Sequence, residues 1–454
     1  MRAPTDDTDR GHWLFGHARA LAAAPHSFVA DRTRHGSGVA PFRMGPKRWF
    51  AVGAAEPARQ VLADPAQAYR RSFHYTRAGA INGDGLIHVD GEPWRVRRSQ
   101  MLPLFRKDRM EQLCRATSVA GRRLEDRWRG AAARGEPIDA VAEGRRLSLS
   151  VMSLALFSEE MSPGDADQLA ALLERSLLLM RLRNTGALPL PDWMPTALNW
   201  QIRRARAALD GFVRPRIIAR RSTAAANGGR DDGLGDDMLD GLLSLRQDDR
   251  PLSDEELEAE AKTLMSAGFE TTAITFAWAL WLLARHPEAQ ARAREEVSAV
   301  VCDDQPSLQD LERLPFLRAV IDETLRLYPP VYNAARVAVR DDELGGHRVP
   351  KGGIVLVGIY AIQRHPDLWD EPDAFRPERF LNRNANKHPA FMPFLRGRHT
   401  CIGNSFAETE LLLALANVVR LWRFRPGVDG AVGVIPRMTL APDRPIWLRA
   451  EAAG

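Results

Sequence analysis

The residue with the clearest chemical potential is Cys401, in a segment that runs from Phe394 to Gly403. The helical pattern that begins at Asn404 places this cysteine just before a helix N-terminus. Free backbone N–H groups and the helix dipole favour a thiolate there. The glycine at 403 lets the backbone approach a flat ligand closely. Such a thiolate suits the axial position of a haem iron; the alternative is a buried, inert cysteine.

A second group of reactive side chains lies inside a long apolar stretch. Glu270 and Thr271 follow Gly268 and are surrounded by hydrophobic residues, where polar groups are costly unless they are hydrogen-bonded. Thr271 could bond a backbone carbonyl and loosen the helix, which would make a groove for O2 with Thr271 as proton donor and Glu270 feeding a water relay. The alternative is helix-internal bonding of Thr271 together with a surface Glu270.

Two further motifs pair charges or donors. Glu323 and Arg326 stand three residues apart on one predicted helix face, and Arg379 follows in a proline-rich segment. A buried Glu323 between the two arginines would pin that segment to the helix, whereas a solvated pair is the alternative. Trp94 and Arg98 lie one turn apart near the start of another helix, a donor pair suited to a carboxylate.

The elements that must position these residues are mostly helical. Ser253 and Glu256 form a capping-box pattern ahead of a proline-free helix to Arg285 whose centre is nearly all apolar or small, as expected for a helix through the middle of a protein. Strand-like pieces occur at 39–43, 49–52, 335–339 and 354–357. We therefore predict a mainly α fold with a minor β lobe, built as one large domain over residues 1–454 around the long helix.

Composition excludes several classes of protein. The net charge is +5, and the basic residues are spread along the chain, so nucleic-acid binding is not expected. The three cysteines, Cys114, Cys302 and Cys401, are far apart and form no C-x-x-C pair, which argues against a disulfide scaffold, structural zinc and an iron–sulfur cluster. The polar start and short apolar runs predict no signal peptide or transmembrane segment, and a cytoplasmic location fits best.

Taken together and in this order, the motifs resemble those of the cytochrome P450 superfamily across essentially the whole chain. The resemblance implies a haem b cofactor ligated by Cys401, an oxygen groove around Gly268, Glu270 and Thr271, and a structural triad of Glu323, Arg326 and Arg379. It also implies the following haem-contacting residues: Trp94, Arg98, Arg336, Phe394, His399 and Gly403. Two positions depart from the usual pattern, since His399 stands where arginine is common and Leu395 where glycine or serine is common.

The implied activity is O2-dependent monooxygenation of a hydrophobic small molecule, by hydroxylation or oxidative cyclisation, with a terpenoid, a fatty acyl chain or an aromatic intermediate as the substrate class. Electrons would come from a separate ferredoxin and its reductase. A docking patch is expected from six basic residues: Arg95, Arg97, Arg106, Lys107, Arg396 and Arg398. The rival hypotheses are a haem-thiolate peroxygenase or isomerase that needs no reductase, and a non-catalytic haem sensor.

Overall fold

The computed structural model describes residues 11–63, 67–106, 109–185, 191, 193–226, 237–247, 249–302, 305–381, 387–428 and 430–453. The chain forms two compact units. The first contains Met1–His74, Leu325–Ala374 and Arg383–Cys401, and the second contains Tyr75–Thr324, Phe375–Asn382 and Ile402–Gly454.

The first unit is organised around a five-stranded sheet in the order β1-β2-β10-β7-β3. Its strands are β1 (Val39–Met44), β2 (Lys47–Val52), β10 (Ile354–Gly358), β7 (Asn333–Ala338) and β3 (Tyr69–Arg71). Strand β10 runs parallel to β2 and antiparallel to β7, so it joins the N-terminal hairpin to a strand nearly 300 residues away. The smaller elements are α1 (Ala18–Ala23), α2 (Pro25–Thr33), α3 (Ala55–Ala63), β8 (Asp342–Leu344), β9 (His347–Val349), α15 (Ile359–Ile362) and η6 (Gly397–His399).

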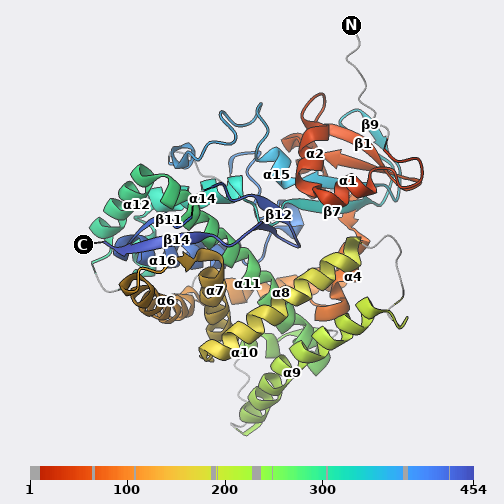
Figure 1. The fold of residues 1–454 in the computed structure, drawn as a ribbon. Helices are drawn as coiled ribbons and strands as arrows, with labels where there is room; N and C mark the ends of the chain where they lie inside the picture. The colour runs from red at the N-terminus through yellow and green to blue at the C-terminus, as the bar shows by residue number, and fades with distance from the viewer. Residues whose placement is uncertain are drawn as a thin grey trace. The chain divides into compact units, whose positions relative to one another are not determined.

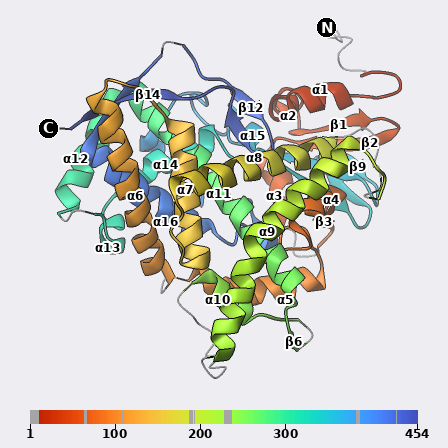
Figure 2. The ribbon, with the colours of Figure 1, turned by 60° about the horizontal axis from the view of Figure 1, so that its bottom comes forward.

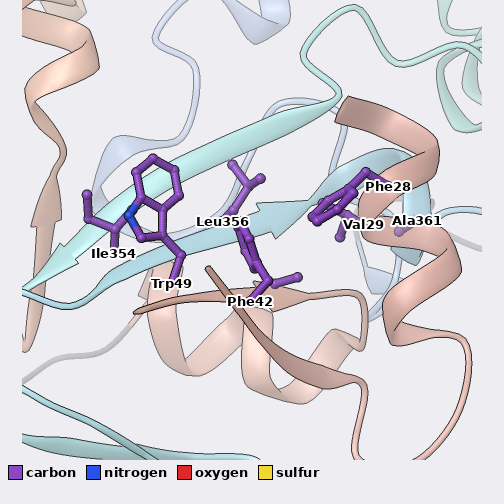
Figure 3. Packing of buried hydrophobic residues seen from close by; sticks show 8 residues of the cluster. Phe28, Val29, Phe42, Trp49, Ile354, Leu356 and Ala361 are labelled. Carbon is purple, nitrogen blue, oxygen red and sulfur yellow. The ribbon is translucent and has the colours of Figure 1, made fainter. Parts of the chain in front are cut away.

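An apolar core holds α2 against this sheet (Figure 3). Phe28 of α2 packs edge-on against Phe42 of β1, with ring centroids 5.1 Å apart, and Phe42 packs against Trp49 of β2. Leu356 of β10 completes the layer. Burial of these large side chains stabilises the lobe because each removes apolar area from water.

The second unit is mainly helical (Figure 1). Its longer helices are α4 (Phe73–Asn82), α5 (Glu92–Met101), α6 (Met110–Ala133), α7 (Ala140–Phe157), α8 (Pro163–Thr185), α9 (Ala197–Ala226), α11 (Asp254–Arg285), α12 (Pro287–Val300), α14 (Pro315–Leu327) and α16 (Asn404–Leu421). The short helices are η2 (Leu102–Phe105), α10 (Met238–Leu243), α13 (Leu308–Leu311) and η4 (Pro377–Phe380). The strands are β4 (Ile138–Asp139), β5 (Arg246–Gln247), β6 (Arg250–Pro251), β11 (Trp422–Pro426), β12 (Val434–Pro436), β13 (Leu440–Pro442) and β14 (Trp447–Ala452).

Helix α11 is the centre of this unit and packs against α7, α9 and α16 (Figures 1 and 2). Its start is capped as the sequence predicted, because the Ser253 side chain accepts from the Glu256 amide and Glu256 bonds back to the Ser253 backbone. Among the described residues it is the one helix long and apolar enough to cross a bilayer, and 83% of its apolar window is buried inside the protein. That degree of burial is typical of a core helix.

The predicted fold class, mainly α with a minor β lobe, is confirmed. Helices α6 and α7 begin at Met110 and Ala140, and the start of α7 is fixed by Asp139, whose carboxylate accepts from the Val141 amide. The single-domain assignment stays a prediction.

Candidate active site

The segment that carries Cys401 belongs to the first unit and has a tightly fixed backbone. Gly397 has φ +74°, and a Cβ there would lie 2.2 Å from the carbonyl oxygen of Leu62. Both the backbone conformation and the lack of space for a side chain therefore require glycine. The Cys401 amide donates to the carbonyl of Phe394 over 2.9 Å, which closes the turn. This part of the sequence therefore presents one cysteine at a defined place.

Cys401 is exposed in the structure, whereas Cys114 is half-buried, and burial raises the pKa of the Cys114 thiol. The alternative of a buried, inert cysteine at 401 is therefore wrong. In the second unit Gly403 is the N-cap of α16, and a Cβ at this position would lie 3.4 Å from the ring of Phe105. An exposed thiol two residues before a helix N-cap is a suitable soft ligand for iron.

One face of α11 is open at its centre. From Leu257 to Ala284 every residue of this helix is buried except Ala267, Gly268 and Thr271. These three are partly exposed and share one face at helical spacing. The Thr271 hydroxyl donates to the Ala267 carbonyl over 2.7 Å, the bond that the sequence suggested. The helix is continuous through this segment, so the loosening predicted from the sequence does not occur, and the partly exposed face lies on an unbroken helix.

Glu270 points away from that face and towards α7. Its side chain is 4% exposed, and Arg145 donates to its Oε1 over 3.3 Å. Arg145 also pairs with Glu174 of α8 over 2.7 Å. The alternative of a surface Glu270 is therefore wrong. Arg145 was not identified from the sequence, although a buried acid on an apolar helix implied a cationic partner somewhere in the chain.

Glu323 and Arg326 of α14 are both fully buried, so the alternative of a solvated pair is wrong. Within the second unit, Glu323 accepts from the Arg379 side chain over 3.3 Å and from the Arg376 amide over 2.9 Å. One carboxylate thus fixes the irregular segment around η4 to the helix.

Arg326 organises the first unit in a similar way. Its guanidinium donates to three backbone carbonyls, those of Gln363, Pro372 and Ala374. It also lies 5.1 Å from the ring centroid of Trp369. Because these acceptors belong to an irregular stretch with few backbone partners, a single buried arginine determines its path.

The predicted haem-contacting residues are held on regular elements. In the second unit, Trp94 and Arg98 lie on α5, with the guanidinium 5.6 Å from the indole centroid. In the first unit, Arg336 lies on β7 and is 2% exposed, and His399 in η6 is also buried. By their chemistry, these residues fit an iron porphyrin in each unit taken by itself: the first unit holds an exposed thiol and N–H donors for carboxylates, and the second holds N–H donors and an open helix face.

The predicted docking patch needs correction at Arg97. Its side chain is 8% exposed and donates to Glu260 over 2.9 Å, to Gln247 and to the Asp84 carbonyl, so it belongs to the interior. The sequence could not show this, because Glu260 lies 163 positions away. Lys107 lies outside the described residues.

Three comparisons with known proteins show the family of the chain. The cytochrome P450 family model matches residues 7–445. Cyclooctat-9-en-7-ol 5-monooxygenase of Streptomyces melanosporofaciens is 31% identical over 91% of this chain and 88% of its own length. Pentalenene oxygenase of Streptomyces avermitilis is 31% identical over 97% of this chain and 95% of its own length. The crystal structure of the cytochrome P450DA heme domain superposes with a TM-score of 0.85 at 26% identity, covering 98% of this chain and 96% of that one.

The chain therefore belongs to the cytochrome P450 family and is an oxygen-incorporating oxidoreductase with a haem-iron cofactor.

Proposed function

We propose that this enzyme is a haem b monooxygenase that oxidises a cyclic terpenoid or a similar hydrophobic intermediate, with electrons from a separate ferredoxin and its reductase. The observation that carries the proposal is the open face of α11 formed by Ala267, Gly268 and Thr271, on a helix that is otherwise buried from Leu257 to Ala284. The exposed thiol of Cys401 in the first unit supports the ligand assignment by itself.

The chain's own residues would divide the work as follows. Cys401 ligates the iron, and the haem supplies O2 activation once it is bound. Trp94, Arg98, Arg336 and His399 would donate hydrogen bonds to the propionates, and the two arginines would neutralise their charge. Thr271 holds a proton at its hydroxyl beside the open face, and Glu270 acts behind it as a proton-carrying carboxylate.

The terpenoid class is supported by two relatives, one named for cyclooctat-9-en-7-ol and one for pentalenene. An apolar substrate also suits a helix face made of alanine, glycine and a threonine whose hydroxyl is turned to the backbone. The cytoplasmic location stays a prediction.

The redox partner is proposed to bind the predicted basic residues that are accessible, without the buried Arg97. Arg106 is exposed, and Arg95 is exposed although it pairs with Glu92. Arg396 and Arg398 are partly exposed and donate to backbone carbonyls of the first unit. An acidic ferredoxin complements this set.

A binding screen tests the substrate class. Purified holoenzyme is titrated with cyclic terpene alcohols, with saturated fatty acids and with aromatic phenols of similar size, and the Soret band is followed for a spin-state change. The proposal expects the shift with the terpenoid set at micromolar concentration. A shift confined to the fatty acids or the phenols would contradict it.

Replacing the ferredoxin system by hydrogen peroxide alone should give little turnover, and the reverse result would favour a peroxygenase.

A further inference from the structure

A cavity of about 190 Å³ lies in the helical unit, apart from the residues assigned above. Its walls come from α6, α7 and the segment in which α8 begins. Helix α6 lies beside α7, and α8 packs against α7 (Figures 1 and 2). None of the residues that we assign to the haem site lines it. The volume is below the roughly 300 Å³ of a pocket for a drug-sized ligand, so the cavity suits a small molecule.

Three arginines from two helices line this cavity. Arg123 and Arg127 stand four residues apart on one face of α6, and Arg146 comes from α7. Like charges at that spacing repel each other along a helix. Among the described residues that line the cavity, Asp167 of α8 is the one acid, so the cations in the lining exceed the anions by two. A lining with this charge favours an anion.

One buried carboxylate holds two of these arginines in place. Glu143 of α7 is 6% exposed and is not part of the cavity lining. It accepts from Nε of Arg127 over 2.9 Å and from Nη1 of Arg146 over 2.7 Å. The indole N–H of Trp128 also donates to it, over 3.2 Å. Because both guanidinium groups are fixed before a ligand arrives, their binding of an anion costs little side-chain entropy.

The lining also keeps polar groups for a ligand. No described residue accepts a hydrogen bond from Nη1 of Arg127. Ser150, one turn after Arg146 on α7, has a buried hydroxyl oxygen without a hydrogen-bond partner among the described residues. A buried polar group without a partner is costly, which favours a ligand that supplies a polar atom.

The acids that compete with a ligand for these arginines are exposed. Arg123 pairs with Glu160, which is 54% exposed, and Arg146 pairs with Asp167, which is 53% exposed. Ion pairs of this kind contribute little to stability, because water and salt screen them. An oxyanion held by two guanidinium groups forms stronger, charge-assisted hydrogen bonds. A bound anion can therefore displace Glu160 and Asp167 without loss of the fold.

The rest of the lining is apolar. Ala120 of α6 is buried, and so are Met161 and Ala166 from the segment in which α8 begins. The side chains of the three arginines are more open, at 35 to 38% exposed. The cavity thus combines an apolar floor with a cationic rim, which suits a molecule with a short apolar body and an anionic head group.

We propose that this cavity is a binding site for a small organic anion, separate from the haem site. The three arginines hold its carboxylate or phosphate head group, and the apolar body lies against Ala120, Met161 and Ala166. Both head groups match the planar fork of a guanidinium group, which can donate two parallel hydrogen bonds to either. The inference does not depend on the proposed substrate or redox partner of the enzyme.

Isothermal titration calorimetry of the holoenzyme tests the site directly. The probes are hexanoate, hexyl phosphate and neutral hexanol, each with an excess of phenylimidazole, which occupies the haem iron and keeps the probes out of the active site. At least one of the two anions should bind with a Kd below about 1 mM. Hexanol should bind at least tenfold more weakly, because it lacks the charge. Comparison of the two anions shows which head group the site prefers.

Substitution of the arginines locates the bound anion. Arg127→Gln should weaken binding of the preferred anion about tenfold or more, as expected for loss of a charge-assisted hydrogen bond. In this variant Glu143 keeps Arg146 and Trp128 as partners, so the local structure should remain.

Arg123→Gln is a second variant with less risk to the fold, since its partner Glu160 is exposed. It should also raise the Kd. Arg129→Gln is the matched control on the same helix, because Arg129 is 64% exposed, pairs with Asp126 and does not line the cavity. This control should bind the anion as the wild type does.

Three results would overturn the proposal. The first is no binding of either anion to the wild type, and the second is equally tight binding of hexanol. The third is an unchanged Kd in both Arg127→Gln and Arg123→Gln, which would place the anion elsewhere on the protein.

Discussion

Arg145 on α7 donates to Glu270 on α11 over 3.3 Å, with the arginine 16% and the glutamate 4% exposed. This contact fixes the Glu270 carboxylate on the side of α11 that lies away from its open face. Removing one member of a buried ion pair lowers the free energy of unfolding by much more than the intact pair contributes to it, because the remaining charge is left buried without a partner.

Arg145→Met should therefore lower the free energy of unfolding by about 3 kcal/mol or more. The double variant Arg145→Met, Glu270→Gln should recover a large part of that loss, because the more deeply buried of the two carboxylates that pair with Arg145 is gone, while Glu174 is 33% exposed. Urea denaturation of the holoenzyme measures both. Arg59→Met is the control, since Arg59 is 61% exposed and pairs with Glu56 at the surface, where the cost should be below about 1 kcal/mol. A double variant no more stable than the single one would contradict the assignment.

Turnover tests the proposed roles of Glu270 and Thr271 in handling protons. Glu270→Gln and Thr271→Ala should each slow product formation by roughly tenfold or more, as expected for loss of a group that handles protons. The measurements are the rate of product formation and the product formed per NAD(P)H consumed, with a screened substrate. Normal coupling in both variants would remove these residues from the mechanism.

Glu323 should be far more important for stability than the exposed Glu378, which is next to Arg379 in the sequence. Glu323→Gln leaves Arg379 beside a weaker acceptor in the interior and should cost about 3 kcal/mol or more, with loss of haem content. Glu378→Gln is the matched control, because Glu378 is 53% exposed and pairs with Arg292 at the surface. An equal loss of stability in the two variants would contradict the conclusion that the burial of Glu323 makes it the more important residue for stability.

Asp322 predicts a pH dependence of stability. Burial raises the pKa of Asp322 from 3.8 to about 7, with a further increase from Glu408 and an opposing effect of Arg318. Between those two pH values the folded protein binds the proton and the unfolded chain does not, so stability falls as pH rises from about 4 to 7. The loss is on the order of a few kcal/mol.

Asp322→Asn should remove this part of the slope, so its gain in stability over the wild type should grow from pH 4 to pH 7. Thermal unfolding at several pH values tests this. A gain that stays constant or shrinks with rising pH would contradict the raised pKa.

Leu395 stands where glycine or serine is common in the family, and its backbone conformation is one that favours glycine. Its φ is +61°, in the left-handed region where a non-glycine residue is strained. Leu395→Gly and Leu395→Ala both remove the side chain, but only glycine relieves the strain. The glycine variant should therefore be about 1 kcal/mol more stable than the alanine variant in urea. Equal stabilities would show that the backbone relaxes at no cost.

The sequence predicted features that local patterns encode. The capping box at Ser253, the long apolar helix and the glycine-framed cysteine segment each depend on residues a few positions apart, and the structure contains them. The order of the sheet strands was not predictable, because β10 pairs with β2 across about 300 residues and no local pattern specifies that register.

Long-range polar partners were missed for the same reason. Glu270 was visible as an acid in apolar surroundings, which signals a buried partner but does not identify it. Arg97 meets Glu260 from 163 positions away, and Arg145 meets Glu270 from 125. Arg97 was even assigned to the surface, since its charge was visible in the sequence and its burial was not.

The spectrum of the reduced enzyme with carbon monoxide tests the central claim, that Cys401 is the thiolate ligand of the haem. The wild type should show the long-wavelength Soret band typical of thiolate-bound haem. Cys401→Ala should abolish it, while Cys114→Ala and Cys302→Ala, which replace the other two cysteines, should retain it. A long-wavelength band that survives in Cys401→Ala would contradict the account.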